Sequence, residues 1–219
     1  MTQYLPIIDL STLNGSNGFR LDGIGANDFS GFSVASAGDV NGDGFTDILI
    51  GAKGGDPGGN SLAGESYVVF GQASGFAAAL DLSTLDGTNG FRLDGVVAGE
   101  YSGTSVASAG DVNGDGFDDI IIGASDSTPG GEFYAGVSYV VFGKATGFAA
   151  ALDLSTLDGT NGFRLDGIDA YDHSGFSLAS AGDVNGDGFD DILIGAPFAD
   201  PSGNSDAGES YVVFGKASG

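Results

Sequence analysis

The chain of 219 residues carries 30 acidic residues against 6 basic ones, which gives a formal net charge of −24. Such a surface repels phosphate groups, so nucleic acid is excluded as an expected partner. No apolar run reaches the length of a membrane span and no signal peptide is visible, so we expect no membrane insertion. With 42 glycines and no cysteine, the composition predicts a turn-rich all-β protein that uses metal ions as cross-links.

Three copies of one unit make up the chain. The pentapeptide Asp-Leu-Ser-Thr-Leu begins at Asp9, Asp81 and Asp153, and other segments keep the same period. A fixed period of this length is the sequence signature of a repeat architecture. We therefore predict a single repeat domain over residues 1–219, with repeat 1 at 9–80, repeat 2 at 81–152 and repeat 3 at 153–219.

Short apolar runs bounded by Gly, Asn, Asp and Ser predict four strands per copy. In repeat 3 they lie at 163–166, 176–182, 191–196 and 210–214. The small residues of 176–182 suit a crowded centre, and the alternating pattern of 163–166 suits an outer edge. This order predicts an all-β fold, a β-propeller with three four-stranded blades per chain. For the connection at 149–157 we expect either a helical turn or a segment packed over the blade edge.

Counted from the centre of the blade, 176–182 is the first strand, 191–196 the second, 210–214 the third and 163–166 the fourth. A nine-residue acidic loop joins the first strand of every blade to the second, and at Asp183 to Asp191 it reads Asp-Val-Asn-Gly-Asp-Gly-Phe-Asp-Asp. Oxygen side chains at loop positions 1, 3, 5 and 9, with a carbonyl at position 7, are ligands that calcium prefers, so we predict three calcium ions per chain. Plain hairpin turns and magnesium are the alternatives. An EF-hand is excluded because isoleucine stands at loop position 12. The predicted ligands are Asp39, Asn41, Asp43, Phe45 and Asp47; Asp111, Asn113, Asp115, Phe117 and Asp119; and Asp183, Asn185, Asp187, Phe189 and Asp191.

The segment from Gly175 to Pro197, around this loop, resembles the FG-GAP repeat of integrin α-subunit β-propellers and of many bacterial surface proteins. The resemblance covers nearly the whole chain. It implies calcium in the acidic loops on one face, and a partner bound by the variable loops on the opposite face. These are 53–64, 125–136 and 197–208 between the second and third strands, and 24–29, 96–101 and 168–173 between blades. It also implies an extracellular or cell-surface location. Lys53 and Ser125 depart from the family pattern because they replace the proline of its Gly-Ala-Pro signature.

Ring closure needs more than one chain on this interpretation. Propellers close with about four to eight blades, and three blades would have to turn by about 120 degrees each. We expect a homodimer with a six-bladed ring, in which strand 18–23 of one chain completes the last blade of the other. A fragment of a larger ring or an engineered repeat set is the alternative.

Three function classes remain open, of which a structural and interaction module of adhesion type is favoured, with a protein or glycan as its ligand. A lectin-like glycan binder would stack sugars on Tyr101, Phe133, Tyr134 and Phe198. A glycan-acting enzyme would need a carboxylate pair, for which Asp126, Glu132, Asp200 and Asp206 are candidates. We expect no enzyme, and we interpret His173 as a surface aromatic residue at a position where the other copies have Phe29 and Tyr101.

Overall fold

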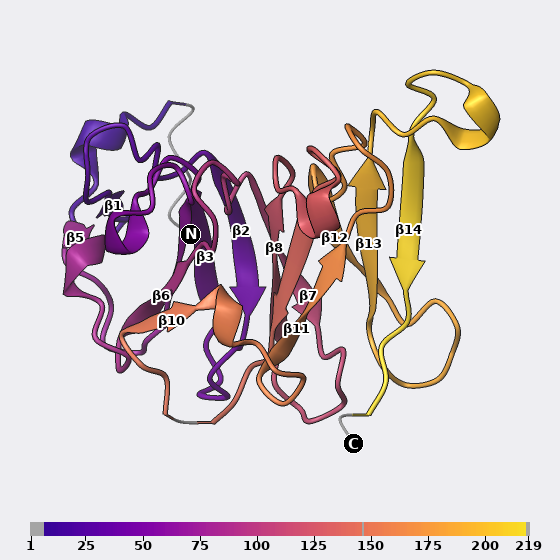
Figure 1. Ribbon diagram of the computed structural model, residues 1–219. Helices are drawn as coiled ribbons and strands as arrows, with labels where there is room; N and C mark the ends of the chain where they lie inside the picture. Colours follow the sequence, from indigo (N-terminus) through magenta and orange to yellow (C-terminus); the bar gives the residue numbers. More distant parts are fainter. Residues whose placement is uncertain (1–6, 146, 218–219) are drawn as a thin grey trace.

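The computed structural model describes residues 7–145 and 147–217, and most of its strands form three sheets that stand side by side (Figure 1). Within each sheet the strands that form the blade are antiparallel and lie in chain order, as expected of propeller blades. Blade 1 consists of β2 (Ser33–Gly38), β3 (Asp47–Ala52), β4 (Glu65–Val69) and β6 (Gly90–Asp94). Blade 2 consists of β7 (Ser105–Gly110), β8 (Asp119–Ala124), β9 (Val137–Val141) and β11 (Gly162–Asp166). Blade 3 consists of β12 (Ser177–Gly182), β13 (Asp191–Ala196) and β14 (Glu209–Val213).

The all-β prediction is confirmed, and the predicted strand bounds hold to within one residue. The predicted strand 191–196 coincides with β13, whereas β12 begins one residue later than predicted and β11 one residue earlier. The only helices in the described residues are short 3-10 turns, and none of them is long and apolar enough to cross a membrane. They are η1 (Leu10–Thr12), η2 (Pro57–Gly59), η3 (Leu82–Thr84), η4 (Pro129–Gly131), η5 (Leu154–Thr156) and η6 (Pro201–Gly203).

The connection between the third and fourth strands of a blade contains a strand that the sequence pattern did not predict. β10 (Ala151–Asp153) runs parallel to β6 and leads directly into η5. In the same way β5 (Ala79–Asp81) runs parallel to β1 (Arg20–Asp22) and leads into η3. The segment 149–157 is therefore both a short strand and a 3-10 turn, and it fastens one blade to the outer strand of the preceding blade.

The inner strands contain small residues because they pack against one another at the centre of the assembly. β7 packs against both β2 and β12, and the Ser, Ala and Gly side chains allow this close approach. The third strands β4 and β9 are buried along their whole length, as expected for strands between stacked sheets. In β6, Phe91 and Leu93 are buried while Arg92 is partly exposed, which confirms the predicted alternation of the fourth strand.

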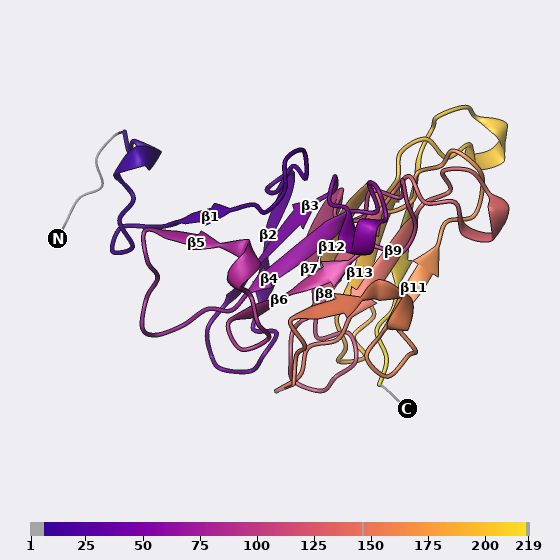
Figure 2. The same cartoon turned by 60° about the vertical axis from the view of Figure 1, so that its left-hand side comes forward.

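The hydrophobic core lies between blades and not within any one of them. One cluster joins blade 1 to blade 2, a second joins blade 2 to blade 3, and a third lies between blade 1 and the pair β1 and β5. Figures 1 and 2 both place β1 and β5 at the end of the row that is farthest from β14. The row of blades thus has two open ends, and the ring closure that we expect from the sequence stays a prediction.

Truncation of an inter-blade aromatic residue is expected to destabilise the protein strongly. Phe91 is fully buried and its ring stacks on Phe148 with a centroid distance of 4.5 Å. We expect Phe91→Ala to lower the free energy of unfolding by about 3–5 kcal/mol, since it removes apolar contacts and leaves a cavity. Denaturant titration followed by circular dichroism measures this loss. Phe133→Ala, at an exposed loop position, should change stability by less than about 0.5 kcal/mol; equal effects of the two variants would contradict the packing described.

Candidate calcium sites

All three acidic loops occupy the same place in their blades, namely the turn between the innermost and the second strand. They lie at the lower end of the blades in Figure 1, after β2, β7 and β12. A register shift marks the end of each inner strand, between Ser36 and Gly38 in blade 1. Gly38 has a φ of +79°, which a residue with a Cβ atom rarely adopts, and this bend starts the loop. The predicted position of the loops is therefore confirmed.

The aspartate at loop position 1 organises the backbone of the loop. In repeat 3, the carboxylate of Asp183 accepts hydrogen bonds from the N–H groups of Gly186, Asp187 and Gly188, at 2.6, 3.0 and 2.9 Å. These bonds stabilise the charged form and hold the pKa of Asp183 below its usual range, with the N–H of Gly188 the largest contributor. Asp111 accepts all three corresponding bonds in its loop, and Asp39 accepts those from Asp43 and Gly44.

Positions 3, 5 and 7 continue the same pattern of local bonds. In repeat 1, Asn41 Oδ1 accepts a hydrogen bond from the N–H of Asp43 at 2.9 Å, and Asp43 Oδ1 accepts one from Phe45 at 2.8 Å. Asn113 and Asp115, and likewise Asn185 and Asp187, repeat these contacts. Among the described residues no hydrogen bond reaches the carbonyl oxygens of Phe45, Phe117 and Phe189, so these predicted position 7 ligands have free lone pairs.

The aspartate at position 9 is buried and joins the loop to the end of the third strand. In blade 2, Asp119 Oδ2 accepts a hydrogen bond from Val112 at 3.0 Å, and its Oδ1 accepts one from Gly143 at 2.8 Å. Asp47 and Asp191 make the equivalent pairs of bonds. The sequence analysis predicted these residues as ligands only; the bonds to Gly71, Gly143 and Gly215 could not be read from their spacing.

Burial and mutual repulsion disfavour the charged form of this aspartate. Burial is the largest cause that raises the pKa of Asp47 to about 6, and the charges of Asp43 and Asp39 raise it further. Burial likewise raises the pKa of Asp119 to about 7, with contributions from Asp115 and Asp111. Each of these loops therefore concentrates negative charge that a bound cation would neutralise.

The oxygen donors have the right chemistry for calcium, but they are turned toward amides in this structure. Within residues 7–145 and 147–217, no three His, Cys, Asp or Glu side chains form a group that could hold a metal ion. Instead, the loop N–H groups donate hydrogen bonds to the carboxylate oxygens, as described above. Each loop nevertheless offers three carboxylates, one amide oxygen and one carbonyl within nine residues, an all-oxygen set that suits a hard divalent cation. On this chemical ground the residues fit calcium.

Loop position 8 has a role that the sequence analysis missed. Asp118 Oδ2 accepts a hydrogen bond from the backbone N–H of Asp39 in the preceding blade at 2.7 Å, and Asp190 Oδ2 accepts one from Asp111 at 2.9 Å. Neighbouring acidic loops are thereby linked across the blade junctions. The sequence held one signal of this role. Position 8 is an aspartate in repeats 2 and 3 although it is not a predicted ligand, and it is Thr46 in repeat 1.

The opposite ends of the blades carry the variable loops and several exposed aromatic rings. The His173 ring stacks on Tyr134 at a centroid distance of 5.6 Å, and its Nδ1 lies 3.1 Å from Asp126 Oδ1. His173 is thus fixed within a cluster of aromatic residues, which agrees with its interpretation as an aromatic stand-in. The pairing with Asp126 was not predicted because the two residues are 47 positions apart.

A cavity of about 490 Å³ also opens among these loops, lined by Phe32, Tyr101, Phe176 and Lys53 together with Asp126. The ammonium group of Lys53 lies 3.8 Å from the centroid of the Phe32 ring. Of the predicted stacking residues, Tyr101 lines this cavity, whereas Phe133 and Tyr134 line a separate hollow beside Glu100. The candidate carboxylates Asp126, Glu132, Asp200 and Asp206 lie in the same loops, and Asp200 and Asp206 belong to one loop, where Asp200 accepts the N–H of Asp206.

Known proteins share this arrangement of repeats. The FG-GAP repeat family matches residues 30–69, 102–141 and 174–213, that is, once in each blade. The chain is 33% identical over 201 residues to integrin alpha pat-2 of Caenorhabditis elegans, which covers 88% of this chain and 14% of that protein. It is 32% identical over 195 residues to integrin alpha-5 of Xenopus laevis, with 87% and 16% covered.

A second kind of relative is the phosphatidylinositol-glycan-specific phospholipase D of Bos taurus. Here the identity is 33% over 178 residues, which covers 81% of this chain and 20% of the relative. The chain thus spans only a fifth or less of these relatives' length. The three matched segments, each centred on a strand, an acidic loop and two further strands, show that the chain belongs to the FG-GAP repeat family.

Proposed function

We propose that the chain is a calcium-stabilised β-propeller module that serves adhesion or another interaction at the cell surface or outside the cell. The observation that carries this proposal is the buried aspartate at position 9, which adds a third carboxylate to those at positions 1 and 5 of a loop that lies at the same end of every blade. FG-GAP repeats often bind calcium through such Asp-rich loops. Integrin alpha subunits contain related repeats, which supports an interaction role and an extracellular location.

Calcium would act on the blade ends through residues that already connect them. The donors at positions 1, 3, 5 and 7 belong to the loop, whereas the aspartate at position 9 begins the second strand and contacts the end of the third. An ion held by this set would join three strands of the blade at one point. With one ion in each of three loops, the formal charge would change from −24 by +6 to −18.

The partner surface that we propose is the end of the blades opposite the acidic loops. There the exposed rings of Phe32 and Phe176 and the partly buried ring of Tyr101 line a cavity together with Lys53, whose ammonium group lies over the Phe32 ring. Aromatic faces with polar groups beside them suit a sugar ring or a protein side chain. We propose a non-catalytic site, because His173 and Asp126 hold each other within the loop cluster and no substrate position is defined between them.

Calcium is expected to raise the melting temperature, and removal of calcium by EDTA to lower it. One site saturated at about 100 times its Kd adds about 2.7 kcal/mol, because the ion binds only the folded state. For a chain of this size that corresponds to about 5–10 °C, since 1 kcal/mol shifts Tm by about 2–4 °C. Differential scanning calorimetry at fixed ionic strength measures the shift, and equal Tm values in calcium and in EDTA would contradict the proposal.

A matched set of variants separates calcium binding from the local hydrogen bonds of the loop. The triple variant Asp43→Asn, Asp115→Asn and Asp187→Asn removes one charge per loop, while an Asn side-chain oxygen can still accept the bond from position 7. Only the side-chain bond from the position 3 amide group is lost. We expect most of the calcium-dependent gain in Tm to disappear, with little change of Tm in EDTA. The control Glu132→Gln, at an exposed loop position, should keep the full gain.

Glycan binding at the variable-loop end is tested with a printed glycan array and fluorescently labelled protein. We expect Tyr101→Ala to weaken binding by about 2- to 10-fold, because an aromatic contact is worth roughly 0.5–1.5 kcal/mol beyond its buried area. Asp86→Ala, in the turn that follows η3 at the acidic-loop end, serves as the control. Absence of any bound glycan would exclude this class of ligand and leave a protein partner, whereas hydrolysis of the arrayed sugars would contradict the non-catalytic proposal.

A further inference from the structure

The segment before β1 exposes an apolar side chain that the other two repeats bury. Leu10 in η1 is 77% exposed, whereas its counterparts one and two repeats later, Leu82 and Leu154, are each 2% exposed. Ile8 is half exposed as well, while Leu80 and Leu152 at the same repeat position pack against core clusters. Repeat 1 therefore has apolar residues at the positions that are buried in the other repeats, but a single chain leaves them exposed.

This segment is already in the conformation that its counterparts adopt when they are docked. Asp9 caps η1 by accepting a hydrogen bond from Ser11 at 2.9 Å, as Asp81 does from Ser83 at 2.9 Å. Asp153 makes the equivalent bond at 2.8 Å. The turn does not need to refold in order to enter a binding site of the same shape, so little conformational entropy opposes docking.

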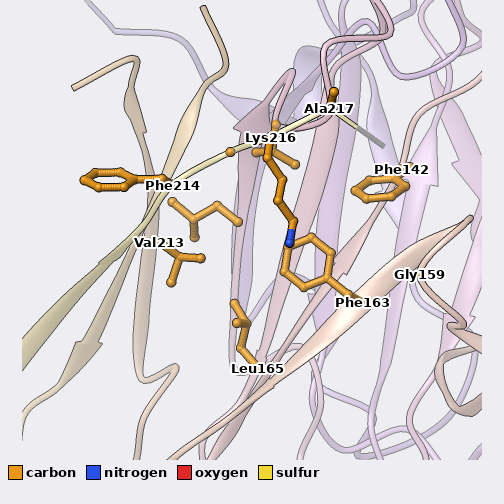
Figure 3. Close-up of a pocket in the computed structure, with 11 residues that line it drawn as sticks. Phe142, Gly159, Phe163, Leu165, Val213, Phe214, Lys216 and Ala217 are labelled. Atoms are coloured by element: carbon orange, nitrogen blue, oxygen red, sulfur yellow. The ribbon is translucent and has the colours of Figure 1, made fainter. Parts of the chain in front are cut away.

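The opposite end of the row contains a cavity that lacks these same side chains. Its volume is about 520 Å³, and Figure 3 shows Phe142, Phe163, Leu165 and Val213 around it. The equivalent space between blades 1 and 2 is closed by Leu152, Leu154, Leu157 and Phe148 from the connection before β11. In Figure 3 the Lys216 side chain extends toward the Phe163 ring, where in the filled junction Lys144 lies over Phe148.

A free strand edge lies beside the cavity. β4 pairs with β6, and β9 pairs with β11, but β14 has no fourth strand among the described residues. β1 has the matching free edge. Among the described residues it pairs only with β5, whereas its repeat counterpart β6 pairs with β4 on its other edge. An unpaired edge of this kind is a template for another chain.

We propose that residues 7–22 of a second copy of this chain complete blade 3, and that the exchange is reciprocal. By the register of the internal repeats, β1 of the second copy pairs antiparallel with β14, with Leu21 opposite Ser210, as Leu93 is opposite Ser66. Ile7 to Asp9 then run parallel to β11, as β10 runs parallel to β6. Ile8 and Leu10 enter the cavity, and Arg20 meets Glu209 as Arg92 meets Glu65 at 3.6 Å.

The faces that would meet in this junction are apolar and open in the single chain. Val212 is 48% exposed, whereas its counterparts Val68 and Val140 are fully buried. On the other face, Val34 of β2 is exposed although Val106 at the same repeat position is buried. The backbone N–H of Lys144 donates to the carbonyl of Val40, and that of Lys216 donates to the carbonyl of Val112, each at 2.9 Å. By the same repeat spacing, the Val184 carbonyl would accept the N–H of Gln72 from the second copy.

For a chain of these 219 residues, the three blades limit how many copies can close a ring. Two chains of three blades give six, within the range of about four to eight in which propellers close, and three chains would give nine. A two-fold axis lets each chain both donate its segment and receive one, so no strand edge remains open. Closed symmetry thereby distinguishes this assembly from an open fibre built of the same contacts.

The molecular mass in solution tests the assembly. At 10 µM protein in calcium and about 0.15 M salt, light scattering coupled to gel filtration is expected to give twice the chain mass of 21.7 kDa. The double variant Ile8→Asp and Leu10→Asp should give the single-chain mass, with a near-native circular dichroism spectrum. Val97→Asp, at an exposed apolar position in a variable loop, should remain dimeric. A monomeric wild type, any other multiple, or a dimeric double variant would overturn the proposal.

A disulfide tests the register directly, because the chain has no cysteine of its own. The variant with both Leu21→Cys and Ser210→Cys should run at twice the chain mass on a non-reducing gel after mild oxidation, and at the single mass after reduction. Each single substitution should stay uncross-linked, since the two-fold axis separates identical positions. Failure of the double variant to cross-link, in a preparation that scatters light as a dimer, would overturn the strand exchange.

Discussion

The carboxylate of the buried aspartate at the start of the second strand is the contact on which the rest of each blade depends. One oxygen of Asp47 accepts a hydrogen bond from Val40 in the loop, and the other accepts one from Gly71, two residues after β4. A charged group is buried at this point because it satisfies two N–H groups that would otherwise lack partners. The cost appears in its raised pKa, and a bound cation would offset that cost. The calcium affinity that we propose would therefore have the same physical origin as the fold of this loop.

Packing between blades imposes the second constraint, and it explains why substitutions in one repeat are balanced by changes in its neighbour. Tyr67 and Tyr211 donate their hydroxyl hydrogen bonds to Glu65 and Glu209 within their own blades. Blade 2 has Val137 at that position, and there the longer Glu100 from the preceding connection lies 3.3 Å from the hydroxyl of Tyr139. The buried tyrosine hydroxyl is satisfied in all three blades, although the carboxylate comes from two different places in the chain.

Sequence periodicity was sufficient to predict the repeats, the strand bounds and the position of the acidic loops. It was insufficient for β5 and β10, because a three-residue strand has too few positions for alternation to appear. It also could not predict which atoms the loop oxygens contact, since a nine-residue motif fixes the donors but not the direction in which each carboxylate turns. Contacts between distant repeats, such as His173 with Asp126, depend on how blades are placed beside one another, and no local pattern records that placement.

The acidic loops contact one another at the blade junctions. The two junctions within a chain and the proposed junction between two chains differ at loop position 8. Gly42 leaves room for the ring of Phe117 from the next blade, and Asp118 binds the backbone of the preceding loop. Neighbouring acidic loops within a chain are therefore in direct contact. At the junction between two chains Thr46 would stand where Asp118 and Asp190 stand, so this charged contact to the loop backbone would be absent. In the proposed dimer, association of the two chains would then depend on Ile8, Leu10 and the apolar faces around them, whose burial must outweigh the repulsion between two chains that each carry a charge of −24.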